Sequence, residues 1–143
     1  MIPLVLASAS SARAAILAGA GVAFTAVLAG IDEDAVKRDL ARAGAGPRAV
    51  AEALAEAKAT VVSRRQGGLV IGADQTLDLD GALFDKAPDL AAARTRLRAL
   101  RGRAHLLHAA LAVARDGKVI WRTTDSPRLT MRAFSDAFLD DYL

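Results

Sequence analysis

Short apolar runs of strand character alternate along this chain with alanine-rich stretches whose apolar positions recur at helical spacing. The first run, Ile2 to Ala7, is apolar and partly β-branched, and it leads directly into a serine-rich segment and an alanine-rich helix. An apolar run bounded by turn residues is typical of a strand buried on both faces. Strands that alternate with helices indicate the α/β class, and the hairpin signals further along the chain indicate a mixed sheet.

The boundaries of the other elements follow from capping residues, glycines and prolines. Helices are expected over residues 11–18, 32–43, 48–65, 89–100 and 135–143. Strands are expected over residues 2–7, 24–31, 69–73, 76–79, 106–114 and 119–131, with hairpin turns at Asp80-Gly81 and Asp116-Gly117. The chain contains no internal repeat and no low-complexity linker, so residues 1–143 are interpreted as one domain.

Composition excludes several kinds of site. The 143 residues include no cysteine and only two histidines, His105 and His108. Disulfides, thiolate nucleophiles, cysteine zinc sites and histidine-rich metal sites are therefore excluded. Because residues i and i+3 of a strand lie on opposite faces, we expect one partly buried and one exposed histidine rather than a shared metal. Trp121 stands alone on a hairpin strand and is expected to be a packing residue.

Charge and hydropathy suggest where the protein acts. The formal net charge is +3, and the basic residues are spread among acidic ones, which favours a solvated surface with a site for an anion over nucleic-acid binding. The first residues lack the basic segment and the length of a signal peptide, and no apolar run approaches the roughly 18 residues of a membrane-spanning helix. We expect a cytoplasmic protein, complete at its N-terminus, without a membrane or nucleic-acid partner.

Two serines and an arginine mark the junction between the first strand and the first helix. At Ser8, Ser10 and Arg13, hydroxyl groups, free backbone N–H groups and a guanidinium converge. This combination is suited to binding phosphate or another anion. The alternative is an ordinary helix N-cap beside a surface arginine.

Carboxylates follow two of the expected strands. Asp74 and Gln75 come directly after the apolar run 70–73, and α/β sheets bind ligands at the carboxyl ends of their strands. Asp32 and Glu33 follow another strand and would supply a second carboxylate for the same divalent metal, since Mg²⁺ is usually held by carboxylates together with substrate phosphates. The alternative for Asp74 is an acid that begins a turn.

Two lysines accompany these acids. Lys58 lies among alanines on the helix expected over residues 48–65, and Lys86 follows the hairpin just before Ala87-Pro88. Each lysine taken alone is interpreted as a solvated surface residue. Together with the acids and the serine-arginine loop, the two lysines become candidates for a phosphate site, because lysine and arginine donors balance the charge of phosphoryl groups.

Several short fragments follow one another in a fixed order over nearly the whole chain: Leu6-Ala7-Ser8-Ala9-Ser10 with Arg13, Asp32-Glu33, Ala53 to Ala59, Ile71-Gly72-Ala73-Asp74-Gln75-Thr76, Asp80-Gly81, Lys86, and Leu100-Arg101-Gly102-Arg103-Ala104-His105. In this order they resemble the Maf family of nucleoside triphosphate pyrophosphatases. The resemblance implies a two-lobed α/β fold with a central cleft, similar to inosine triphosphate pyrophosphatases. It also implies hydrolysis of a nucleoside triphosphate to the monophosphate and pyrophosphate with Mg²⁺ or Mn²⁺, in housecleaning of unwanted nucleotides by a possible homodimer.

The resemblance also implies roles for individual residues. Asp74 would be the catalytic acid that activates water, and Glu33 would hold the metal together with Asp74. The triphosphate would be held by Ser8, Ser10, Arg13, Lys58 and Lys86.

The chain departs from the family pattern at three places. Ala12 stands where the family commonly has an arginine linked to substrate choice. Gln75 replaces the threonine of the subgroup that acts on dTTP and UTP, and is similar to the subgroup that acts on 7-methyl-GTP. Family members also usually continue past Leu143 into a segment that completes the cleft. These departures leave the preferred base open, and they motivate an alternative function as a non-catalytic nucleotide-binding or cell-division-regulating protein.

Overall fold

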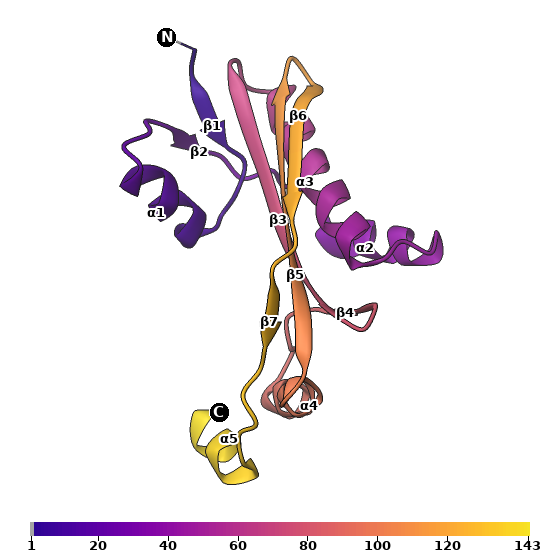
Figure 1. Cartoon of the computed structure of the whole chain (residues 1–143). Helices are drawn as coiled ribbons and strands as arrows, with labels where there is room; N and C mark the ends of the chain where they lie inside the picture. The colour runs from indigo at the N-terminus through magenta and orange to yellow at the C-terminus, as the bar shows by residue number, and fades with distance from the viewer. Residues whose placement is uncertain (1) are drawn as a thin grey trace.

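A computed structural model describes residues 2–143. Its strands are β1 (Leu4–Leu6), β2 (Thr25–Ala26), β3 (Leu69–Leu79), β4 (Ala82–Phe84), β5 (Ala104–Arg115), β6 (Lys118–Asp125) and β7 (Arg128–Thr130). Its helices are α1 (Ser11–Gly19), α2 (Glu33–Arg42), α3 (Pro47–Ser63), α4 (Leu90–Leu100) and α5 (Asp136–Tyr142). The long strands β3 and β5 run the length of the molecule; β1, β2 and α1 gather near one end, and α4 and α5 near the other (Figure 1).

The strands form one mixed sheet, which confirms the predicted fold class. Its central order is β2-β1-β3-β5-β6, with β4 paired to β3 and β7 paired to β5. Strand β1 is parallel to both of its neighbours, β2 and β3, and the other pairings are antiparallel. Because β1 and β2 are short while β3 continues, β3 extends past their carboxyl ends and borders the space beyond them.

Helix α3 packs on one face of the sheet through small residues. Pro47 occupies its first turn and Gly46 its N-cap, as expected for a helix that begins at a proline. The packed surfaces consist of alanines on the helix and on β5. The helix also lies very close to β3, where a Cβ atom on Gly72 would be 2.1 Å from the Ala55 carbonyl oxygen. Thr76 of β3 joins that strand to α3 with a buried hydrogen bond from its hydroxyl to the Pro47 carbonyl, at 2.8 Å.

Three strands differ from their predicted extents. The two strands expected before and after Asp74 are one continuous strand, because Asp74 and Gln75 pair with Ala110 and Ala109 of β5. The strand expected over 24–31 is reduced to Thr25–Ala26. The strand expected over 119–131 is divided into β6 and β7 around Pro127, which has no N–H group to donate to a neighbouring strand.

Expectations for three aromatic side chains also need correction. Both histidines are buried, whereas one was expected to be exposed. His108 has two half-buried partners: its Nδ1 lies 2.7 Å from Ser126 Oγ and its Nε2 lies 2.8 Å from Asp78 Oδ2. Trp121 is exposed rather than packed, because it pairs with Val113 on the face of the sheet that α3 does not cover.

Over residues 2–143, none of the helices has the length and apolar character needed to cross a bilayer.

Candidate active site

A cavity of about 380 Å³ opens beyond the carboxyl ends of β1 and β2. Its walls come from the β1–α1 loop, the segment after β2, the start of α2, the middle of α3 and the centre of β3. Six of the predicted site positions line it: Ser8, Ser10, Arg13, Glu33, Lys58 and Asp74. These residues are far apart in the sequence, so the fold itself brings them together.

The β1–α1 loop is organised by its two serines. Ser8 is buried, and its hydroxyl oxygen accepts hydrogen bonds from the Ser10 backbone N–H and from the Arg13 guanidinium, each at 3.1 Å. Ser10 is the N-cap of α1, and its hydroxyl accepts from the Arg13 N–H at 3.2 Å. The two interpretations of this motif are therefore compatible, since the same segment caps a helix and turns hydroxyl and guanidinium groups toward the cavity.

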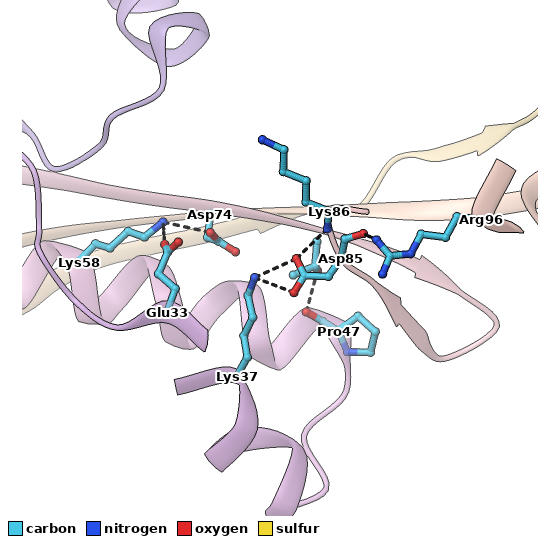
Figure 2. Close-up of polar contacts among 9 residues, drawn as sticks. Glu33, Lys37, Pro47, Lys58, Asp74, Asp85, Lys86 and Arg96 are labelled. Carbon is cyan, nitrogen blue, oxygen red and sulfur yellow. Dashed lines mark hydrogen bonds and ion pairs between the residues drawn. The ribbon is translucent and has the colours of Figure 1, made fainter. Parts of the chain in front are cut away.

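Lys58 lies between two carboxylates at the base of the cavity. Its Nζ is 3.1 Å from Asp74 Oδ1 and 3.4 Å from the Ala73 carbonyl oxygen, and it also contacts Glu33 Oε1 (Figure 2). The Lys58 side chain is 11% exposed and that of Asp74 14%. An unpaired ammonium would be costly at this depth, so the two carboxylates are what allow a lysine to lie among alanines on α3.

The environment of Asp74 favours its protonated form. Burial raises the pKa of the Asp74 carboxyl, and the neighbouring Glu33 charge raises it further. The charge and the hydrogen bond of Lys58 oppose this effect, but the pKa remains above its ordinary value. A carboxylate with a raised pKa is a stronger base, which suits it to accept a proton from water.

The carboxylates of the cavity fit a divalent cation whose remaining coordination positions are filled by water and by the phosphates of a bound ligand. Over residues 2–143, His, Cys, Asp and Glu side chains form no group of three or more that could hold a metal ion alone. Glu33 and Asp74 nevertheless present oxygens to one shared position, where the Lys58 ammonium now provides the positive charge. Mg²⁺ is typically bound through one or two carboxylates with the remaining positions taken by water and phosphate oxygens, so Glu33 and Asp74 are the residues that would hold it.

Other predicted site residues lie outside this cavity. Lys86 is exposed, and its side chain extends away from Asp85 into open space (Figure 2). Gln75 follows Asp74 within a strand, so it points to the opposite face of the sheet and is exposed. Ala12 is exposed on the first turn of α1, and Asp32 caps α2 by accepting a hydrogen bond from the Ala35 N–H at 3.0 Å.

Sequence reasoning missed two kinds of neighbour. Residues 28–31 line the cavity with apolar side chains and backbone, although the sequence suggested only a strand there. Lys37 forms an ion pair with Asp85, which directly precedes Lys86 (Figure 2). The available signal for Lys37 was its position four residues after Glu33, which places both side chains on one face of a helix.

The cavity thus combines a loop of hydroxyl and guanidinium groups with a lysine and two carboxylates, on a mixed α/β sheet. The family model described as "Maf-like protein" matches residues 3–143. The chain therefore belongs to the Maf-like family.

Relatives agree with this assignment, and a solved structure shares the fold. The chain is 58% identical over 141 residues to a protein of Caulobacter vibrioides named nucleoside triphosphate pyrophosphatase, covering 99% of this chain and 71% of that protein. It is 45% identical over 143 residues to a protein of Brucella abortus named 7-methyl-GTP pyrophosphatase, covering 99% and 72%. The structure of a HAM1 protein from Coxiella burnetii matches in fold with a TM-score of 0.57 at 16% identity, covering 90% of this chain and 71% of that one.

Proposed function

We propose that this protein hydrolyses a nucleoside triphosphate to the nucleoside monophosphate and pyrophosphate, with a divalent cation as cofactor. The observation that carries the proposal is the placement of Lys58 between Glu33 and Asp74 at the base of a cavity that also contains the serine-arginine loop. The names of the relatives support the same reaction.

The loop and the lysine bind the phosphates in this proposal. Ser8, Ser10 and Arg13 offer hydroxyl and guanidinium donors from the β1–α1 loop and the start of α1, and Lys58 offers an ammonium from α3. Lys86 lies outside the cavity in the free protein, and it would reach the phosphates only through a movement of its side chain or of the segment that carries it. Donors fixed around the phosphates stabilise the charge that develops as the phosphoanhydride breaks.

The reaction is the in-line attack of water on the α-phosphorus. A bond forms from the water oxygen to that phosphorus, the bond from the phosphorus to the α–β bridging oxygen breaks, and pyrophosphate leaves. Asp74 accepts the proton that the water loses, because burial raises the pKa of its carboxyl and so makes its carboxylate a stronger base. A divalent cation bound at Glu33 and Asp74 would supply charge neutralisation on the phosphate oxygens and would make water more acidic.

The nucleoside is proposed to lie against the apolar wall next to the phosphate loop. A neighbouring hollow of about 320 Å³ is lined by the loop serines together with Ala14, Ala26 and Leu28. Apolar walls with a few polar groups are typical of small-molecule sites. Ala12 and Gln75 remain predicted specificity residues, and the preferred base is left to experiment.

The test is metal-dependent release of pyrophosphate across standard and modified nucleoside triphosphates, with 7-methyl-GTP included because of the relatives' names. We expect activity with Mg²⁺ or Mn²⁺ that Asp74→Asn reduces by at least about a hundredfold, the range in which a proton-transfer group contributes. Asp116→Asn is the matched control, because Asp116 lies in the β5–β6 turn at φ 52°, a conformation that asparagine accepts.

Each outcome decides between the candidate functions. Activity lost in Asp74→Asn and kept in Asp116→Asn supports the enzyme. Thermal stabilisation by a nucleotide without turnover supports the alternative, a non-catalytic nucleotide-binding or division-regulating protein. A folded protein that neither binds nor hydrolyses any nucleotide of the panel contradicts both. The proposed homodimer and cytoplasmic location are tested separately, by light scattering and by imaging of a tagged protein in cells.

A further inference from the structure

Helix α2 is tied to other elements by two of its polar side chains. It carries no fully buried residue, and its apolar residues Ala35, Val36 and Leu40 are half-buried. Two of its side chains, Glu33 and Lys37, are four residues apart and share one face. Glu33 reaches Lys58 on α3, and Lys37 reaches Asp85 in the segment between β4 and α4 (Figure 2).

The Lys37–Asp85 contact is an ion pair to both carboxylate oxygens. Lys37 Nζ donates to Asp85 Oδ1 and to Oδ2 at 3.0 Å each, with the two side chains 23% and 48% exposed. The Asp85 carboxylate also accepts the Lys86 N–H at 3.1 Å, and the Asp85 carbonyl accepts a hydrogen bond from Arg96 of α4. Residue 85 is therefore anchored to α2, to α4 and to the backbone of the residue that follows it.

The carboxylates around Lys37 favour its charged form. Burial alone would lower the pKa of its ammonium, but the hydrogen bond to Asp85 and the charges of Asp85, Asp74 and Glu33 outweigh burial and raise it. The same ion pair contributes to a lowered pKa of Asp85. Both partners are thus held in their charged forms at neutral pH.

We propose that Lys37 and Asp85 are positioning residues that join α2 to the segment carrying Lys86. The pair ties α2, which carries Glu33, to the backbone at Asp85, the residue before Lys86, so that these two distant parts of the chain are held at a defined separation. The pair itself touches no reacting atom. This inference rests on the proposed function for its consequence in catalysis, but its structural part stands on the ion pair alone.

The experiment compares Lys37→Met, Asp85→Asn, the double variant and the conservative variant Lys37→Arg. Asp39→Asn is the matched control, because Asp39 forms an ion pair within the same helix, with Arg42 at 3.4 Å, and both side chains are 76% exposed. Amide hydrogen exchange of residues 33–42 and 85–89 is measured on the free protein. KM and kcat are then measured with the best nucleotide of the panel.

An exposed or partly exposed ion pair is worth up to about 1 kcal/mol, which corresponds to roughly a fivefold change. We expect exchange in α2 to be about fivefold faster in Lys37→Met and in Asp85→Asn, and KM to rise about fivefold while kcat changes less than about twofold. The double variant should resemble the single ones, since the second substitution removes a partner already lost. Lys37→Arg and Asp39→Asn should behave like the unaltered protein.

The outcomes separate this inference from the proposed function. Unchanged exchange in α2 would overturn the inference even if the enzyme is fully active. Faster exchange with an unchanged KM would overturn the positioning role. Equal changes in the Asp39→Asn control would show that any charge lost from α2 has the same effect, which also contradicts the proposal. If the unaltered protein hydrolyses no nucleotide, the proposed function fails, and exchange still decides whether the pair holds α2.

Discussion

Replacing Gly72 by alanine should disturb both the stability and the site, because it forces α3 away from the sheet. A Cβ atom at this position would lie 2.1 Å from the Ala55 carbonyl oxygen, 2.7 Å from the Ala59 nitrogen and 2.9 Å from Ala59 Cβ. Two of these three atoms belong to the backbone of α3, so no side-chain rotation can relieve the overlap. The helix itself must move outward.

The magnitude follows from the size of that movement. Non-bonded carbon atoms have their optimal separation near 3.5 to 4 Å, so relief of the closest contact requires a shift of about 1 Å or more. Overpacking of a close-packed core costs typically 1–3 kcal/mol, and a clash with backbone belongs at or above the upper end, about 3 kcal/mol. For a chain of this length that is roughly a 10 °C fall in Tm.

The same shift should reduce activity. Lys58 directly precedes Ala59 on α3, and Asp74 is two residues from Gly72 on β3. An outward movement of α3 therefore lengthens the 3.1 Å contact between Lys58 Nζ and Asp74 Oδ1. A displacement of about 1 Å in a catalytic arrangement can reduce the rate about a hundredfold. The measurements are denaturant unfolding, thermal unfolding and kcat/KM.

Gly67→Ala is the matched control, since nothing lies within 4 Å of a Cβ at Gly67. It should change stability by no more than about 0.5 kcal/mol. A Gly72→Ala protein whose stability falls by less than about 1 kcal/mol would refute the reasoning, because it would show that α3 does not rest on Gly72 as closely as these distances require.

Two further predictions concern ionisation. In metal-free buffer, Lys58→Met should raise the pKa of Asp74 further, because the charge and hydrogen bond of the lysine are the largest of the effects that lower it. A carbon NMR titration of the Asp74 carboxyl measures the shift, and an unchanged or lower pKa contradicts the prediction. Stability of the unaltered protein should fall as the pH rises through the pKa of Asp74, and this fall should be absent in Asp74→Asn. A carboxyl whose folded pKa is raised contributes stability below its unfolded pKa and loses it as the pH rises through the folded pKa, whereas asparagine does not ionise. Thermal unfolding of both proteins across the acidic and neutral range measures the difference, and the same pH dependence in both would contradict this prediction.

Local sequence patterns were sufficient for much of the fold. Caps and breakers act over a few residues, so Ser10 and Pro47 correctly indicated where α1 and α3 begin. The pattern failed at Asp74, where polar residues suggested the end of a strand. The pairing of β3 with β5 continues there because alanines of β5 leave room beside polar side chains, and that pairing is invisible to a window around residue 74.

Part of the site could be predicted from residue types and their neighbours in the sequence. Asp74, Lys58 and Glu33 were proposed from their types and surroundings, and the structure brings them together. The Lys37–Asp85 pair joins positions 48 residues apart, and no local pattern connects them. The same is true of His108 and Asp78, which are 30 residues apart. Charged residues that are far apart in the sequence come together only in the folded protein, so a single sequence does not reveal which of them form pairs.

The position of β1 in the sheet has a consequence for synthesis on the ribosome. Leu4 of β1 pairs with Leu69 of β3, which is synthesised about 65 residues later. At about 5–20 residues per second, β1 and the serine-arginine loop wait roughly 3 to 13 seconds before the partner strand exists. During that interval the apolar side chains of β1 lack the strand that covers them in the folded protein.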